Sequence, residues 1–96
     1  MNLGFFYLQR NNLALAEKHL LKSVELGSSD FGNMNLGHVY LAKGEKEKAL
    51  DAYKLSFSNF DDPNTFIEGF EDDYQYVAQY GITKEEYSEI KKVILS

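Results

Sequence analysis

The chain has 96 residues and a formal net charge of −5, with 44% hydrophobic and 26% charged residues. This length gives one small domain, and the composition is that of a folded globular protein. Because the sequence contains no cysteine, it excludes disulfides, thiolate catalysis and cysteine-ligated zinc.

The negative charge is concentrated in residues 61–81. This segment contains no lysine or arginine and carries Asp61, Asp62, Glu68, Glu71, Asp72 and Asp73. The chain has no basic stripe that could neutralise phosphates, so we expect it to bind neither nucleic acid nor an anionic membrane surface. It also has no apolar run long enough to cross a bilayer and no secretory signal peptide at its start. We therefore expect a cytoplasmic protein.

The first 27 residues are similar to the stretch that lies 33 positions further along the chain. Aligning residue i with residue i + 33 gives eight identities, where ordinary residue frequencies supply roughly two. The identical pairs are Met1/Met34, Asn2/Asn35, Leu3/Leu36, Gly4/Gly37, Tyr7/Tyr40, Leu8/Leu41, Ala16/Ala49 and Ser23/Ser56. Such a period is typical of stacked structural repeats. We predict one unit at 1–28 and a second at 29–61.

Each unit is predicted to form two antiparallel helices joined by a tight turn. The apolar residues of the second unit recur every three or four positions, as a helix requires. Gly44 stands between its two helices, and Asn11 holds that place in the first unit. Both residue types tolerate the left-handed conformation that ends a helix. The run GSSD at 27–30 then stops the first unit and caps the next helix.

The last third, residues 62–96, is predicted to be a further helical pair that closes the stack. Asp62 followed by Pro63 is a helix-start pair, and Gly81 ends that helix. Thr83 with Glu86 forms a capping box for the final helix. The repeat motif itself is lost here, so this pair is either a degenerate repeat or a capping hairpin.

Five positions in each of the first two units resemble the tetratricopeptide repeat, which has about 34 residues and a fixed pattern of Leu-Gly, Tyr, Ala and Phe. The matching residues are Leu3, Gly4, Tyr7, Ala16 and Leu20 in the first unit, and Leu36, Gly37, Tyr40, Ala49 and Tyr53 in the second. Asn33 replaces the tryptophan of the pattern, and its terminal proline is missing. The resemblance implies an all-α fold in one domain, 1–96. Its antiparallel helix–turn–helix units would stack as a short right-handed solenoid of about six helices.

The resemblance also implies function: a protein–protein interaction module or scaffold, with no enzymatic activity and no cofactor. In this family the first helices of the units line a concave groove that binds a peptide or partner segment. By register the groove residues are Phe5, Leu8, Gln9, Met34, Asn35, His38, Leu41 and Ala42. Leu8 and Leu41 are expected to pack inside instead. The candidate binding residues are Phe5, Gln9, Met34, Asn35 and His38, because apolar and amide side chains suit peptide recognition.

One class of ligand for this family is not expected. Chaperone-binding members hold a C-terminal carboxylate with lysine, asparagine and arginine side chains. Asn35 matches one of these positions, but Met1 and Phe5 stand at the first lysine and first asparagine, and residues 55–83 contain no lysine or arginine.

The side chains that could carry other chemistry are two histidines and an acidic cluster. His19 and His38 fall on different helices, and no carboxylate is placed in sequence to orient either, so we expect no catalysis. The acids at 68–73 lie within a helix and not around a glycine turn, which argues against a metal site. We expect a solvated face that is a candidate contact patch for a basic partner, formed by Glu68, Glu71, Asp72 and Asp73.

The alternative function is structural. Met1 aligns with a residue in the middle of the repeat motif. The chain would then be the C-terminal capping end of a longer repeat array, or a homodimer that pairs through its exposed N-terminal helix at Phe5 and Phe6. The oligomeric state in solution distinguishes this role from peptide binding.

Overall fold

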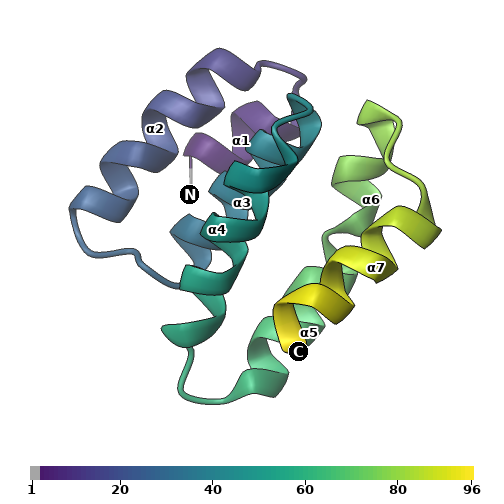
Figure 1. The fold of residues 1–96 in the computed structure, drawn as a ribbon. Coiled ribbons are helices and arrows are strands. Elements are labelled where there is room, and N and C mark those ends of the chain that lie inside the picture. Colours follow the sequence, from purple (N-terminus) through teal and green to yellow (C-terminus); the bar gives the residue numbers. More distant parts are fainter. Residues whose placement is uncertain (1–2) are drawn as a thin grey trace.

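The computed structural model describes residues 3–96, and these residues form helices and connecting turns without a strand (Figure 1). The all-α prediction is therefore confirmed for this part of the chain. In chain order the elements are α1 (Leu3–Gln9), α2 (Leu13–Glu25), α3 (Phe31–Ala42), α4 (Lys46–Ser58), α5 (Pro63–Asp72), α6 (Tyr74–Val77), the short 3-10 helix η1 (Ala78–Tyr80) and α7 (Lys84–Leu95). Within the same residues, no helix combines the length and the apolar character that crossing a bilayer requires.

The turns contain left-handed residues at the predicted positions. Asn11 ends α1 with φ 61°, and Gly44 holds the equivalent turn after α3 with φ 82°. Gly27 and Gly81 also have positive φ, at 117° and 87°. A Cβ atom at Gly44 would meet nothing within 4 Å. The backbone conformation, and not a lack of space, therefore favours glycine there.

Four helices begin at a side-chain cap. Asn12 accepts a hydrogen bond from the Leu15 amide, and Asp30 from the Phe31 amide. Asp62, directly before Pro63, caps α5 through the Asn64 amide. The hydroxyl of Thr83 accepts from the Glu86 amide at the start of α7, which confirms the predicted helix start.

In each of the first two units a glycine lets the paired helices cross closely. A Cβ atom on Gly4 would lie 2.2 Å from Cγ of Leu20 on α2, and one on Gly37 would lie 2.4 Å from Cε1 of Tyr53 on α4. Leu20 and Tyr53 are themselves 33 positions apart. The repeated Leu-Gly step therefore has the same role in both units, namely to admit a large side chain from the second helix of the pair.

Helix α3 lies at the centre of the molecule. All residues from 32 to 39 are buried, because α3 packs on α2 and α4 and also meets α5 and α6. Two hydrophobic clusters meet at this helix. One joins it to the first unit through Leu36 and Val39, against Leu8 and Leu20. The other joins Met34, Leu41 and Tyr53 to the last third of the chain, through Phe66, Phe70, Val77, Tyr87, Ile90 and Ile94.

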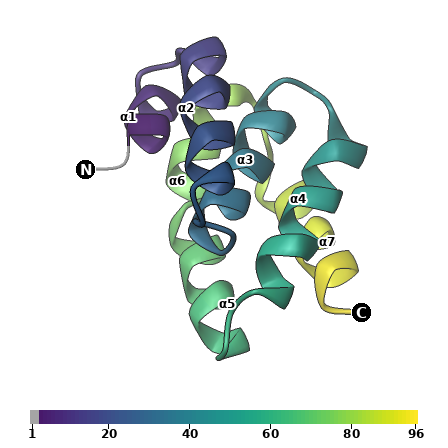
Figure 2. The same cartoon turned by 90° about the vertical axis from the view of Figure 1, so that its left-hand side faces the viewer.

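The last third folds back over the first two units. Helices α5, α6 and η1 follow one another in a bent segment, and α7 returns beside it and contacts α4 (Figure 1). Helix α6 meets α1 through the rings of Tyr76 and Phe5, whose centroids lie 4.9 Å apart, and Figure 2 shows both helices on the same side of the molecule. We call residues 69–80 the strap. The strap passes from α3 to α1, on the side of the molecule where the sequence predicts the groove.

Candidate functional site

The strap is attached to α1 by ring packing and hydrogen bonds. The rings of Phe5 and Tyr76 meet edge to face, with their centroids 4.9 Å apart. The Tyr80 hydroxyl donates to the carbonyl of Leu8. The side-chain amide of Gln79 donates to the same carbonyl at 3.3 Å and to that of Gln9 at 3.4 Å. These carbonyls belong to the last turn of α1, whose carbonyls lack the full set of helical donors; that of Leu8 also accepts from the Asn11 amide at 3.3 Å. The strap therefore caps a helix that lies about 70 residues earlier in the chain.

The strap is attached to α3 through His38, which is fully buried. Its Nε2 lies 3.0 Å from a carboxylate oxygen of Asp73, and its Nδ1 lies 2.7 Å from the hydroxyl of Tyr53 on α4. Burial, and to a lesser extent the charge of Asp73, hold the pKa of Tyr53 well above its usual value of 10.0. The carboxylate of Asp73 can only accept, so Nε2–H donates to it, and Nδ1 then accepts a hydrogen bond from the Tyr53 hydroxyl, which stays protonated. One imidazole thus joins three helical segments.

This arrangement is suited to structure more than to chemistry. The sequence of groups resembles a proton relay, but Tyr53 and His38 both have 0% exposure, so a substrate cannot reach them. His19, the other histidine, stacks on Tyr7 with ring centroids 5.3 Å apart and belongs to a different part of the molecule. The sequence analysis found no carboxylate placed to orient His38, and this expectation is wrong. Asp73 lies 35 residues further on, and only the tertiary fold brings it there.

The structure corrects the expected exposure of the groove residues. Met34 and His38 are fully buried beneath the strap, and Asn35 is only 6% exposed. Gly69 of the strap lies against α3: a Cβ atom there would lie 3.3 Å from Cε, the flexible end of Met34. Leu8 and Leu41 are buried, as expected. Gln9 is exposed, and Phe5 is half-buried under Tyr76.

A cleft remains open beside the strap. It has a volume of about 360 Å³ and is lined by Phe5, Phe31, Asn35, Gly69 and Asp73. Phe31 is 45% exposed there, so an aromatic ring is available to a ligand. The side-chain amide of Asn35 has no hydrogen-bond partner within residues 3–96. Every fully buried polar side-chain atom in that range does have a partner, so the amide atoms of Asn35 are not fully buried. The amide therefore reaches the solvent of the cleft. Two of the predicted residues, Phe5 and Asn35, thus share this cleft.

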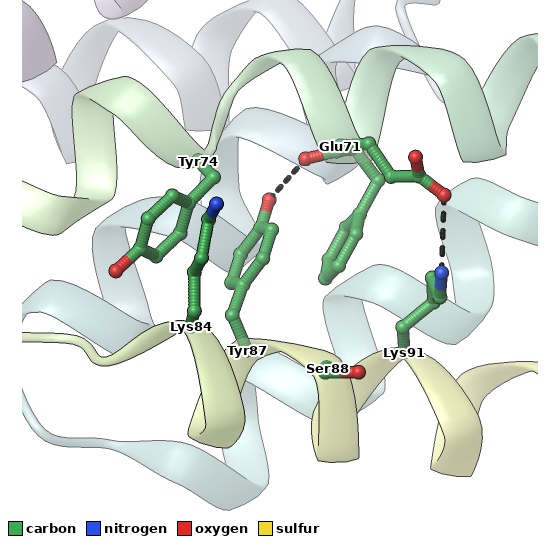
Figure 3. Close-up of a pocket in the computed structure, with 7 residues that line it drawn as sticks. Glu71, Tyr74, Lys84, Tyr87, Ser88 and Lys91 are labelled. Carbon is green, nitrogen blue, oxygen red and sulfur yellow. Dashed lines mark hydrogen bonds and ion pairs between the residues drawn. The ribbon is translucent and has the colours of Figure 1, made fainter.

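A second pocket, of about 290 Å³, lies between the strap and α7 (Figure 3). The ring of Tyr87 stacks on Phe70 at 4.0 Å, and its hydroxyl donates to the carbonyl of Phe70. Burial raises the pKa of Tyr87 well above its usual value. Tyr74, Lys84, Ser88 and the ion pair between Glu71 and Lys91, at 3.0 Å, form the rest of the lining. The aromatic floor of this pocket belongs to the hydrophobic core, and its rim is charged.

The predicted acidic patch is divided by the fold. Glu71 is paired with Lys91 and Asp73 with His38, which leaves Glu68 and Asp72 as exposed carboxylates without an ion pair in the described chain. Among residues 3–96, no group of three or more histidine, aspartate or glutamate side chains is arranged to hold a metal ion.

Comparison with known proteins bears on the second unit. Residues 32–59 match the family model of the tetratricopeptide repeat. A search of curated proteins and a search of solved structures gave no match at the threshold applied. The matched segment comprises most of α3 and the whole of α4, including Gly37, Tyr40, Ala49 and Tyr53, which carry the resemblance in the sequence. These residues form the crossing of α3 and α4, and the match supports a tetratricopeptide repeat assignment for the segment 32–59.

Proposed function

We propose that this chain is a protein–protein interaction module that binds a segment of a partner protein in the cleft between α1, α3 and α5. Tetratricopeptide repeats generally act as interaction modules and not as enzymes, and the match at residues 32–59 carries this general role to the chain. The choice of cleft is supported by its lining residues.

The observation that carries the proposal is that the side-chain amide of Asn35, which has no hydrogen-bond partner among residues 3–96, lies in a cleft with aromatic walls. Phe5 and Phe31 line the same cleft as this amide. An amide offers both a donor and an acceptor, which can pair with the backbone of a bound peptide. Aromatic walls give the apolar contact area that supplies most of the binding energy at such sites.

Affinity capture from a lysate of the source organism, followed by mass spectrometry, tests this function. The native chain is compared with Asn35→Ala and Phe31→Ala. Leu26→Ala is the matched control, because Leu26 is 78% exposed and follows α2, outside the cleft. We expect a partner that is captured by the native chain and the control and lost from both cleft variants. All four proteins must have the same circular dichroism spectrum. A partner retained by both cleft variants would contradict the proposal.

A second candidate function is self-association through the N-terminal end of the stack. Leu36 is 4% exposed because the first unit covers it, whereas its counterpart Leu3 is 48% exposed. Phe6, the counterpart of Val39, is half-buried beneath the guanidinium of Arg10, which lies 4.8 Å from the centre of the ring. The surface that is covered in the second unit is therefore open in the first.

Sedimentation velocity tests this second candidate. If the N-terminal face pairs two copies, Leu3→Glu will convert a dimer into a monomer. Leu55→Glu, at a site that is 52% exposed on α4, will leave the dimer intact. A native chain that sediments as a monomer at all concentrations would rule out this function and favour the cleft.

The exposed acids are proposed to contribute to the affinity for a basic partner. Glu68 and Asp72 lie on α5, which borders the cleft. Exposed charges act mainly on the rate of association and are screened by salt. We therefore expect capture of such a partner by the native chain to weaken as the salt concentration rises.

A further inference from the structure

The side of the two repeat units where the sequence predicts the groove is covered by a segment of the chain itself, namely the strap. The strap contains three helical pieces and carries Asp73 at the junction of α5 and α6. Its contacts with α1, α3 and α4 are made by a small number of side chains at regular spacing. They therefore show which features of a helix this face recognises.

His38 recognises Asp73, the acidic residue of the strap, through a hydrogen bond. Because Tyr53 donates to Nδ1, the other ring nitrogen presents a hydrogen atom to the strap, and the carboxylate of Asp73 accepts it at 3.0 Å. The side chain of Asp73 is 18% exposed and that of His38 is 0% exposed. A hydrogen bond to a carboxylate in such a place is stronger than one to a neutral acceptor. His38 therefore favours an acid at this position.

Aromatic residues on either side of the acid occupy separate places. Phe70, three positions before Asp73, packs edge to face on Tyr53 with centroids 5.1 Å apart. Tyr76, three positions after it, packs on Phe5 at 4.9 Å. Tyr80, seven positions after it, donates its hydroxyl to the carbonyl of Leu8. Phe70 lies on α5, Tyr76 on α6 and Tyr80 on η1, so the three aromatic residues reach α4 and α1 from separate helical pieces around the turn at Asp73.

We propose that this face selects a bent helical segment in which an acidic residue at the bend has an aromatic residue three positions before it and aromatic residues three and seven positions after it. The strap is the occupant within the chain, and a partner segment with this pattern displaces it. This inference rests on the proposed function, since it names the kind of partner segment that the module binds. The cleft at Asn35 adjoins this face, because Gly69 and Asp73 of the strap line it, and a displacing segment supplies its own residues at those two places.

Displacement has a measurable consequence for affinity. When its own chain covers a site, a partner can bind only the molecules in which the cover has left. The apparent affinity is therefore the intrinsic affinity multiplied by the fraction of such molecules. Asp73→Ala removes the carboxylate from the strap but leaves His38, Phe5 and the Leu8 carbonyl in place. The altered chain is then expected to accept a carboxylate from another molecule more readily than the native chain does.

The test uses a fluorescent synthetic peptide of residues 66–81 and the full chain, with binding followed by fluorescence anisotropy. We expect the peptide to bind the Asp73→Ala chain about tenfold more tightly than the native chain. Asp51→Ala is the matched control: Asp51 is an exposed acid on α4 without an ion pair in the described chain, and its removal should leave the affinity at the native value. A peptide with asparagine in place of Asp73 should bind the Asp73→Ala chain about fivefold more weakly than the native peptide.

The Tyr80→Phe chain provides a second route if Asp73→Ala does not fold. This substitution loosens the other end of the strap without altering the acid, and it should also raise the affinity for the peptide. The inference is overturned if folded Asp73→Ala and Tyr80→Phe chains bind the peptide no better than the native chain does, or if the asparagine peptide binds equally well. Exchange of straps between two native chains, seen as a dimer by sedimentation, would assign the site to a second copy and also overturn it. Loss of partner capture in Asn35→Ala would still uphold the proposed function in each of these cases.

Discussion

His38 shows how one side chain can determine the position of three helices. It lies on α3, receives a hydrogen bond from Tyr53 on α4 and donates one to Asp73 at the start of α6. A fully buried imidazole is costly unless both ring nitrogens are paired. Because both partners come from other helices, each contact also fixes the approach of a helix to α3.

Tyr53→Phe is expected to lower the free energy of unfolding by about 1–3 kcal/mol, because it leaves Nδ1 of His38 buried without a partner. Tyr7→Phe is the matched control, since Tyr7 is half-buried, stacks on a histidine and makes no hydrogen bond through its hydroxyl within the described residues. Urea unfolding, followed by circular dichroism, measures both changes. Equal losses in the two variants would show that the contact with His38 does not contribute to stability.

Two glycines within helices should respond differently to the same substitution. A Cβ atom at Gly37 would lie 2.4–2.9 Å from the ring of Tyr53, whereas at Gly69 it would meet the flexible end of Met34 at 3.3 Å. Gly37→Ala is therefore expected to destabilise the protein by about 1–3 kcal/mol, despite the gain in helix propensity. Gly69→Ala should be close to neutral. Thermal melting of both variants checks this, and a Gly37→Ala protein as stable as the native chain would contradict the close crossing of α3 and α4.

Among the elements, the strap is unusual because it joins parts of the chain that are not neighbours in the repeat. In an open stack of repeats each unit contacts only the next one. Here η1 reaches the last turn of α1 through Gln79 and Tyr80, so the third helical pair stabilises the first as well as the second.

Tyr80→Phe is expected to increase hydrogen exchange at the end of α1, where the amides of Arg10 and Asn12 bond to the carbonyls of Phe6 and Tyr7. Loss of one donor from the Leu8 carbonyl frees that turn to open locally. The amides of α4 should exchange at the native rate, because Tyr80 makes no contact with that helix within the described hydrogen bonds and ring contacts. Mass spectrometry of peptide fragments measures both regions, and unchanged exchange in α1 would argue against capping by the strap.

For the whole molecule, tyrosine ionisation should determine stability at high pH. Burial raises the pKa of Tyr40, Tyr53, Tyr80 and Tyr87 above the usual value of 10.0. Below about pH 9 these phenols are protonated in both the folded and the unfolded state, so stability does not depend on them. Above about pH 10 the unfolded chain loses protons that the folded chain retains, and the free energy of unfolding falls.

Urea unfolding at pH 8 and pH 10.5, together with the absorbance of tyrosinate near 295 nm, measures this effect. Tyr87→Phe should weaken the pH dependence, because it removes one phenol with a raised pKa. If all seven tyrosines of the chain ionised near pH 10 while it stayed folded, the close packing around Tyr53 and Tyr87 would be wrong.

Local signals made much of the fold predictable from the sequence. The turns at Asn11, Gly27, Gly44 and Gly81 were predictable because a helix end depends on a few adjacent residues. The caps at Asp62 and Thr83 follow from the same kind of pattern. The repeat then supplied the pairing of α1 with α2 and of α3 with α4, since equal sequences at a fixed period form equal units.

The path of the strap was not predictable in this way. Register placed His38 correctly on the inner side of α3, but it carries no information about what covers that side. The acids at 68–73 have the spacing of a solvated helix face, and only tertiary packing separates Asp73 from Asp72. Met34 and Asn35 were therefore expected to be open to a partner, although the strap buries them.

The strap also sets the number of repeat units that fit between its two ends. It extends from Gly69, opposite Met34 on α3, to Tyr80, at the carbonyl of Leu8 on α1, so its length matches the span of two first helices. Inserting another 33-residue unit between these two would carry α1 beyond the reach of Tyr80, and deleting one would leave the end of the strap without a helix to cap. Open repeat proteins gain and lose units readily in evolution because each unit contacts only its neighbours. Here, the number of units between the two ends of the strap could change only if the length of the strap changed with it.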